Sequence, residues 1–315
     1  MKIVRKNQSQ PKPFQNAIAS YAGLTLIYLL LVSFLPANPA TKLAYHLSNG
    51  QYHILLFCVV LPSILIWFAG FYGYAMLKSY AQSIYDAQEG QSFNRLGTGC
   101  AWLVWSLPVS SITAQLLGGI ANAHPGFHNA SIIISNYVAM ILPLVGFSII
   151  SAATRGLTAQ AGLQLSLASA RTIILGFVAG GVIFCYLTFR QFSLITLSAT
   201  HNPYFLPVWL VVISLVIPYL YGWFLGVLAT YEISVYSQQT RGVLYRQALR
   251  LFSGGLVAVI TSFIALQYLQ SVQPRTGHLI LNQHLIWMDI FKVLAGVGFL
   301  LIAFGVARLK KIEDI

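Results

Sequence analysis

Charged residues are scarce in this sequence. Asp, Glu, Lys and Arg together make up 8% of its 315 residues, whereas hydrophobic residues make up 57%. Soluble domains carry about 25% charged residues, and a chain with so few could not cover a soluble globule with polar surface. The mean hydropathy of +0.73 agrees with this. The composition therefore excludes an ordinary soluble protein and predicts a polytopic membrane protein.

Acidic residues are scarcer still, with six against 18 Lys and Arg, which gives a net charge of +12. In a soluble protein this excess would suggest nucleic-acid binding, but the sequence has no long basic tract with interleaved aromatic residues. Basic residues collect in the cytoplasmic loops of membrane proteins, which explains the excess. We therefore expect the lipid bilayer as a partner and no nucleic acid.

Motifs that carry familiar chemistry are also missing. The sequence contains no GxxxxGK[ST], HExxH or GxSxG motif, so it offers none of the usual routes to ATP hydrolysis or peptide cleavage. Its three cysteines, Cys58, Cys100 and Cys185, are too far apart for a CxxC motif, and we expect small buried side chains. An enzyme is therefore the less favoured class, and no cofactor is predicted from these motifs.

Long apolar runs are abundant. Eight segments approach the roughly 20 residues that a membrane helix needs, and their continuous apolar character favours helices over barrel strands. We therefore expect an all-α bundle of about eight transmembrane spans, at 17–36, 53–77, 100–121, 131–153, 172–189, 206–229, 251–270 and 285–307. These spans give an N-terminal tail (1–16), a four-span half (17–153), a cytoplasmic linker (154–171), a second four-span half (172–307) and a C-terminal tail (308–315).

The distribution of basic residues predicts the orientation. With an even number of spans, both termini lie on one side of the membrane. If that side is cytoplasmic, the two tails and the cytoplasmic loops hold fourteen basic residues and the outer loops hold three, with Lys292 inside a span. This bias favours cytoplasmic termini, and we expect the plasma membrane.

Two cytoplasmic segments resemble each other. Residues 80–95 and 231–246, which are 151 positions apart, share five of sixteen residues. The same offset carries spans one to four onto spans five to eight, so either the chain is a parallel 4+4 duplication or the segments are two similar amphipathic loops. Both segments are predicted to be helical hairpins, ended by Gly90 and Gly242, which either bind a protein partner or cap the bundle. The hairpin residues of interest are Tyr80, Tyr85, Arg95, Tyr231, Tyr236 and Arg246.

All seven histidines fall on the outer side in this topology. Neutral imidazole is a common ligand of zinc, copper and haem iron. A transition-metal or haem site, a pH sensor and no specific role are therefore the alternatives, although the outer loops hold no carboxylate to complete a metal site. The seven are His46, His53, His124, His128, His201, His278 and His284.

Two pairs of glycines have the GxxxG spacing that lets helix backbones approach closely. Gly176 and Gly180 lie in the fifth span, and Gly222 and Gly226 lie in the sixth. We expect both faces to be tightly packed, either within the chain or in a dimer. The oligomeric state stays open.

The stretch WMDIFKVLAGVGFLLIAFG, at 287–305, places Asp289 and Lys292 inside the last span or at its edge. They are one helical turn apart and can neutralise each other. In the predicted topology Asp289 is the one carboxylate of the outer half. The pair is therefore either an interfacial anchor or an intramembrane group that relays protons or binds a solute.

These features favour a passive or ion-coupled carrier of a small solute. The alternative is a non-catalytic membrane subunit or scaffold that binds a partner through the hairpins at 80–95 and 231–246.

Overall fold

The structure, a computed structural model, describes residues 49–84, 86–123, 128–162, 208–239, 242–271 and 278–313, together with single residues within 19–23 and 171–179. At several helix ends it describes the backbone alone, including 49–64, 121–123, 128–133, 208–216, 271 and 278–285. The first and fifth predicted spans, 17–36 and 172–189, therefore lie outside the described residues apart from those single positions.

The described part of the chain is all-helical, as the sequence predicts. Its six long helices contain the other six predicted spans almost completely, and none of the described residues forms a strand. The helices are α3 (Asn49–Ser83), α4 (Ala87–Ala123), α5 (His128–Gln160), α7 (Val208–Gln239), α8 (Val243–Ser271) and α9 (His278–Glu313).

Three of these helices contain segments long enough and apolar enough to cross a membrane: Tyr137–Gln160, Val243–Leu266 and Ile286–Ile312. Large apolar side chains on the outside of the bundle, among them Ile141, Val297 and Phe304, are exposed. An apolar exterior of this kind is costly in water and suits lipid. The helices are thus compatible with a multi-pass integral membrane protein.

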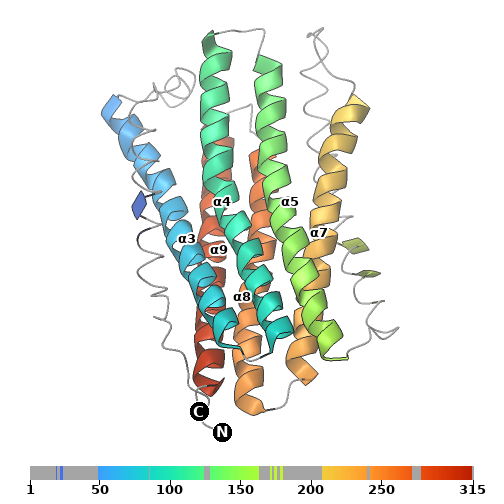
Figure 1. The fold of residues 1–315 in the computed structure, drawn as a ribbon. Coiled ribbons are helices and arrows are strands. Elements are labelled where there is room, and N and C mark those ends of the chain that lie inside the picture. The colour runs from blue at the N-terminus through green and yellow to red at the C-terminus, as the bar shows by residue number, and fades with distance from the viewer. Residues whose placement is uncertain are drawn as a thin grey trace.

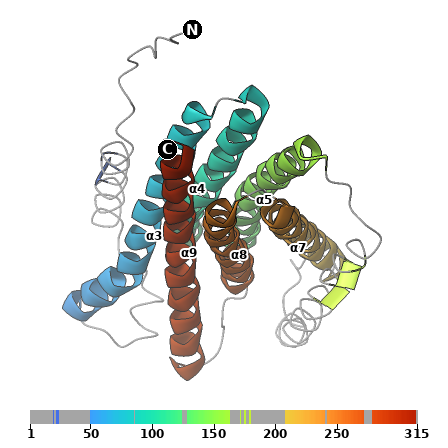
Figure 2. The same cartoon turned by 90° about the horizontal axis from the view of Figure 1, so that it is seen from below.

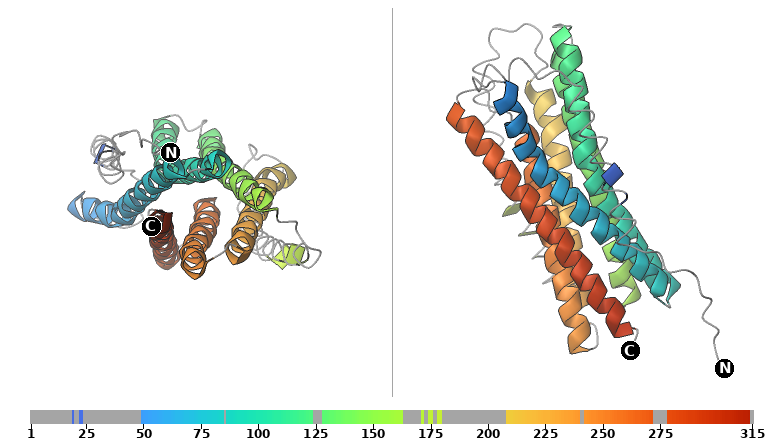
Figure 3. Two further views of the ribbon diagram at one scale, coloured as in Figure 1. Left: turned by 60° about the horizontal axis from the view of Figure 1, so that its bottom comes forward. Right: turned by 90° about the vertical axis from the view of Figure 1, so that its left-hand side faces the viewer.

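The six helices form two rows of three (Figure 3, left). The first row contains α3, α4 and α5, and the second contains α7, α8 and α9. Within each row consecutive helices pack on each other, and the rows meet where α5 packs on α7 and where α9 packs on α3. Figure 2 shows the bundle from below, with α9 beside α3 and α7 beside α5.

Both helical hairpins turn at one end of the bundle, the lower end in Figure 1. We call this the hairpin end. The last turns of α9 reach the same end, because the Lys310 Nζ donates a hydrogen bond to Ser79 Oγ, 3.2 Å away on α3. The hairpin end therefore joins the α3–α4 turn, the α7–α8 turn and the C-terminal part of α9.

The two hairpin turns are stabilised in different ways. Asp86 caps α4, since its Oδ1 accepts hydrogen bonds from the backbone N–H groups of Gln88 (2.8 Å) and Glu89 (3.3 Å). Gly242, with φ of 101°, forms the α7–α8 turn in a conformation that favours glycine. The prediction that Gly90 ends the first hairpin helix is wrong, because Gly90 lies in the first turn of α4 and donates its N–H to the Asp86 carbonyl.

Close backbone contacts hold each row together. A Cβ added at Gly255 would lie 2.5 Å from the Gly298 carbonyl oxygen, so α8 and α9 cross with their backbones in contact. In the same way, a Cβ added at Gly99 would lie 3.0 Å from the Gly146 carbonyl oxygen, where α4 crosses α5. Each row thus contains one tight glycine crossing between its second and third helices.

Candidate functional site

Asp289 and Lys292 form an ion pair within α9. The Lys292 Nζ lies 3.3 Å from the Asp289 Oδ1, one helical turn away. The two side chains differ in exposure, since 7% of the Lys292 side chain and 33% of the Asp289 side chain are accessible. The charged nitrogen is therefore the enclosed member of the pair.

Lys292 lies on the face of α9 that packs into the bundle. Ala295, Phe299 and Ile302, which follow at helical spacing on that face, are fully buried. The opposite face carries exposed apolar residues such as Ile290 and Val293. The lysine side chain thus enters the interior between the rows, where α9 packs on α3 and α8.

The histidines cannot be assembled into a site from the described residues. His53 lies in α3, His128 begins α5, and His278 and His284 lie in α9, all with backbone described but no side chain. The remaining three, His46, His124 and His201, lie outside the described residues. The described part of the chain contains no group of three His, Cys, Asp or Glu that could hold a metal ion. A metal or haem site at the histidines stays a prediction.

Of the two glycine pairs, the second is described. A Cβ added at Gly222 would meet Leu144 of α5 at 3.2 Å, and one added at Gly226 would overlap Ile260 of α8. These glycines therefore pack within the chain, each against a different helix. Gly176 and Gly180 lie outside the described residues.

The two hairpins contact each other through a cluster that we call the tyrosine clasp: Tyr80, Glu89, Tyr236 and Tyr245. The Tyr236 hydroxyl donates to Glu89 Oε1 at 2.8 Å, and the Tyr245 hydroxyl donates to the same oxygen at 3.4 Å. The hydroxyls of Tyr80 and Tyr245 are 3.3 Å apart. The clasp ties the α3–α4 hairpin to the α7–α8 hairpin.

Tyr236 is held in its neutral, hydrogen-donating form. Burial raises the pKa of its hydroxyl, and the neighbouring Tyr245 and the Glu89 carboxylate raise it further. Among the other predicted hairpin residues, Arg95 and Arg246 are exposed, Tyr231 is half-buried, and Tyr85 lies outside the described residues.

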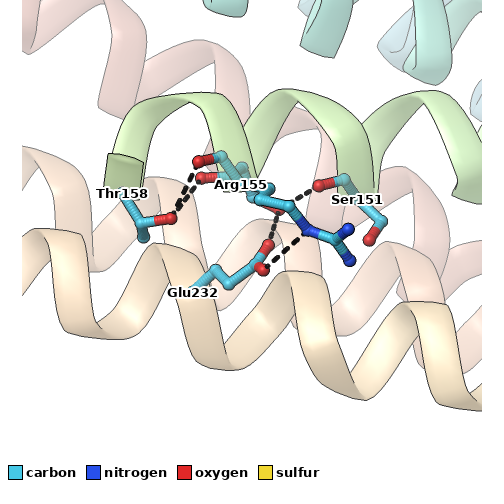
Figure 4. A network of polar contacts seen from close by, with 5 residues as sticks. Ser151, Arg155, Thr158 and Glu232 are labelled. Carbon is cyan, nitrogen blue, oxygen red and sulfur yellow. Dashed lines mark hydrogen bonds and ion pairs between the residues drawn. The ribbon is translucent and has the colours of Figure 1, made fainter. Parts of the chain in front are cut away.

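A second polar network joins the rows where α5 packs on α7 (Figure 4). Glu232 of α7, with 2% of its side chain accessible, points at the last turns of α5. Its Oε2 lies 2.6 Å from the Thr154 hydroxyl, and its Oε1 lies 3.6 Å from Nε of Arg155. Arg155 is 65% exposed, so its guanidinium lies on the outside of the bundle, whereas the Glu232 carboxylate lies in the interior.

Burial raises the pKa of the Glu232 carboxyl. The Thr154 hydroxyl and the Arg155 guanidinium lower it by less than burial raises it. Glu232 lies three residues beyond the predicted end of the sixth span, 206–229. The opposing influences on its pKa therefore act at the end of the helix bundle. A carboxyl group in such surroundings can take up or release a proton when its access to water changes.

Sequence reasoning missed Glu232 as a site residue. A signal was present, since TYEISVY places a carboxylate in the continuation of an apolar helix, where it must face either solvent or another helix. What the sequence could not supply is the partner, because Thr154 is 78 residues away.

Comparisons with known proteins give no relative: no protein-family model, no curated protein and no solved structure matches the chain.

Proposed function

We propose that this protein is a carrier of a small solute, built from two related and parallel halves of four spans each, in which the Asp289–Lys292 pair contacts the solute or a coupling ion. The observation that carries the proposal is Lys292, a charged amine turned into the interior of an apolar bundle. Ionisable side chains in membrane helices are costly, and they mark solute and ion pathways.

Repeated contacts in the two rows support the related halves. Gly70 of α3 packs against Val104 of α4, and Gly226 of α7 packs against Ile260 of α8. The second pair follows the first by 156 positions at both residues. The first two helices of each row therefore correspond at an offset of 156.

The third helices correspond at an offset of 152. The crossing of Gly99 with Gly146 recurs as the crossing of Gly255 with Gly298. Short identities follow the same registers, because WFAG at 67–70 matches WFLG at 223–226, and VGF at 145–147 matches VGF at 297–299. The duplication we propose thus pairs Tyr80 with Tyr236, whereas the offset of 151 taken from the hairpin sequences pairs it with Tyr231.

This correspondence helps to distinguish a functional role of Lys292 from a role in packing. Its counterpart in α5 is Met140, which is also buried, and the counterpart of Asp289 is Tyr137. An apolar, unbranched side chain fills the same place in the first row. This apolar counterpart favours a role of Lys292 in solute or ion binding over an interfacial anchor.

The orientation we propose has the hairpin end in the cytoplasm and the protein in the plasma membrane. Exposed basic side chains gather at that end, as the positive-inside rule requires. They include Lys78, Arg95, Arg155, Arg246, Arg250 and Arg308.

The proposal is tested with the full-length chain in liposomes, offered radiolabelled amino acids, sugars, carboxylates and nucleosides in turn. We expect uptake of one class above that of empty liposomes. Lys292→Met should reduce the uptake rate by about tenfold or more, the effect of losing a contact worth roughly 1.4 kcal/mol. Met140→Leu, at the corresponding buried position, is the matched control and should transport normally. Equal rates for Lys292→Met and the unmodified chain would remove the pair from the mechanism.

A membrane subunit or scaffold is the second candidate, and one observation favours it. Val243 and Leu244, at the start of α8, are 70% and 65% exposed and lie beside the exposed Arg246 and Arg250. Such an apolar and basic surface suits a protein partner. Under this function, replacing Val243 and Leu244 by Ser should remove cross-links to a defined partner in the native membrane, while all solute uptake assays stay negative.

A further inference from the structure

The polar contacts described between the two rows gather at the hairpin end. They comprise the tyrosine clasp, the Glu232 network and the hydrogen bond from Lys310 to Ser79. The Asp289–Lys292 pair lies towards the opposite end and within one helix. In a carrier whose halves move against each other, contacts between halves at one end close that end. On the proposed function, the clasp and the Glu232 network form an inner gate, which is closed in this structure.

The number of hydrogens available at Thr154 indicates whether Glu232 carries a proton in the closed gate. The Thr154 hydroxyl has one hydrogen, but two oxygen atoms lie within hydrogen-bond distance of it: Glu232 Oε2 at 2.6 Å and the Ser151 carbonyl at 3.0 Å. If Glu232 is ionised, both oxygens are acceptors and they compete for that hydrogen. If Glu232 carries a proton, its own O–H donates to Thr154 Oγ1 and the threonine donates to Ser151. One added proton therefore satisfies both contacts.

We propose that Glu232 is the proton-binding residue of the inner gate: it holds a proton while the two rows are closed at the hairpin end and releases it to the cytoplasm when they separate. Nothing but the proton is transferred. It leaves the Glu232 carboxyl for cytoplasmic water as the Glu232–Thr154 contact opens. The proton is thus the coupling ion of the carrier, and this step rests on the proposed function.

The direction of the effect follows from burial. While the rows are closed, burial is the largest influence on the pKa of Glu232 and raises it. In the open gate the carboxyl meets water and its pKa returns towards the ordinary value. The closed state therefore binds the proton more tightly than the open state, so lower pH favours closure and higher pH favours opening.

Among the side chains of this network, Glu232 is the one that binds and releases the proton. From α5 it faces Arg155, whose Nε lies 3.6 Å from Glu232 Oε1. On α8 the titratable side chain nearest in the clasp is Tyr245, whose hydroxyl contacts Glu89 and Tyr80. At the corresponding junction of α3 and α9, Met76 takes the place of Glu232, and Val306 takes the place of Thr154. In the proposed correspondence the Glu232–Thr154 contact does not recur at the α3–α9 junction, where Lys310 and Ser79 form a different polar contact.

The test measures the distance between spin labels on Gln91→Cys and Gln247→Cys, two exposed positions on α4 and α8. The three native cysteines are replaced by Ala, and the full chain is placed in nanodiscs of neutral and acidic phospholipid. We expect the distance distribution to shift towards longer values as the pH rises from about 5 to about 8.5. Glu232→Gln, which is neutral at every pH, should stay at the short distance throughout.

Two further variants guard against a misfolded Glu232→Gln chain. Arg155→Gln removes the cation that lowers the pKa of Glu232, so the opening transition should move to higher pH. Asp86→Asn removes an exposed carboxylate of the hairpin end that lies outside the gate and keeps an oxygen that can cap α4, so it is the matched control; its transition should keep the midpoint of the unmodified chain.

The outcomes separate the two proposals. A pH transition that persists in Glu232→Gln would overturn the proton site while leaving moving halves and a carrier intact. A constant distance at all pH values in every variant would also overturn it, and solute uptake in liposomes would then judge the carrier independently. Loss of the transition in Glu232→Gln together with its shift in Arg155→Gln supports the assignment.

Discussion

Lys292 and Glu232 are ionisable side chains enclosed in the bundle, and in the proposed duplication each corresponds to a methionine in the other row. Met140 takes the place of Lys292, and Met76 takes the place of Glu232. Methionine is long, unbranched and adaptable, so it fills the space that a Lys or Glu side chain occupies. The proposed correspondence therefore predicts that the bundle tolerates an uncharged residue at both positions, whereas an ionised side chain buried there is costly.

The double change Asp289→Asn and Lys292→Met should leave the protein as resistant to heat as the unmodified chain. The buried charge of Lys292 and the half-buried charge of Asp289 are removed together, so neither is left unpaired. Thermal unfolding followed by tryptophan fluorescence in detergent measures this. Clear destabilisation, or failure to insert, would identify the pair as a structural anchor.

Glu232→Gln should raise the melting temperature under mildly alkaline conditions. The pKa of Glu232 is raised in the folded protein, so its ionised form costs stability above that pKa, and one pKa unit corresponds to about 1.4 kcal/mol. As the pH falls and Glu232 takes up its proton, the advantage of Gln should shrink. A melting temperature below that of the unmodified chain in alkaline buffer would contradict the direction of this pKa shift.

Among the helices, the tight crossings are the most sensitive contacts. Gly254 and Gly255 are neighbours on α8, yet a Cβ at Gly254 would meet nothing within 4 Å, whereas one at Gly255 would collide with the α9 backbone. The two positions therefore form a matched pair in which helix propensity is the same and packing differs.

Gly255→Ala should destabilise the protein by about 1–3 kcal/mol, the usual cost of overpacking. Gly254→Ala should be neutral or stabilise it by up to about 1 kcal/mol, because alanine favours helix over glycine. Denaturant titration of both variants in detergent checks this. Similar effects at the two positions would mean that α8 and α9 are not in backbone contact.

The sequence predicts the described helices well, whereas the duplication that it suggests stays a prediction. Long apolar runs require helices in lipid, so six of the predicted spans fall in α3, α4, α5, α7, α8 and α9. The hairpin sequences suggested an offset of 151, because matching tyrosines recur there on helices with similar polar faces. The glycine contacts favour 156, and the WFAG and WFLG stretches carry that register in the apolar part of the chain, where composition is similar everywhere and identities are easily overlooked.

The candidate sites show the same division. Asp289 and Lys292 could be paired from sequence because one helical turn separates them. The clasp and the Glu232 network could not, because Tyr80 and Tyr245 are 165 residues apart and Glu232 and Thr154 are 78 apart. Contacts between residues so far apart in the sequence depend on how the two rows pack, and local sequence patterns do not encode that packing.

For the bundle in its membrane, the proposed orientation predicts which loops a reagent can reach. Asp86→Cys, in the α3–α4 turn, should react with a membrane-impermeant maleimide only after the membrane is opened, since this turn lies at the hairpin end. A cysteine introduced between α8 and α9, at residues 272–277, should react in intact cells. Labelling of Asp86→Cys in intact cells would reverse the proposed orientation.

The glycine crossings also decide where this protein can bend. Backbones in contact at Gly99 with Gly146, and at Gly255 with Gly298, leave those helix pairs no slack to slide past each other. In any rearrangement of the bundle, α4 with α5, and α8 with α9, would therefore move as two rigid pairs.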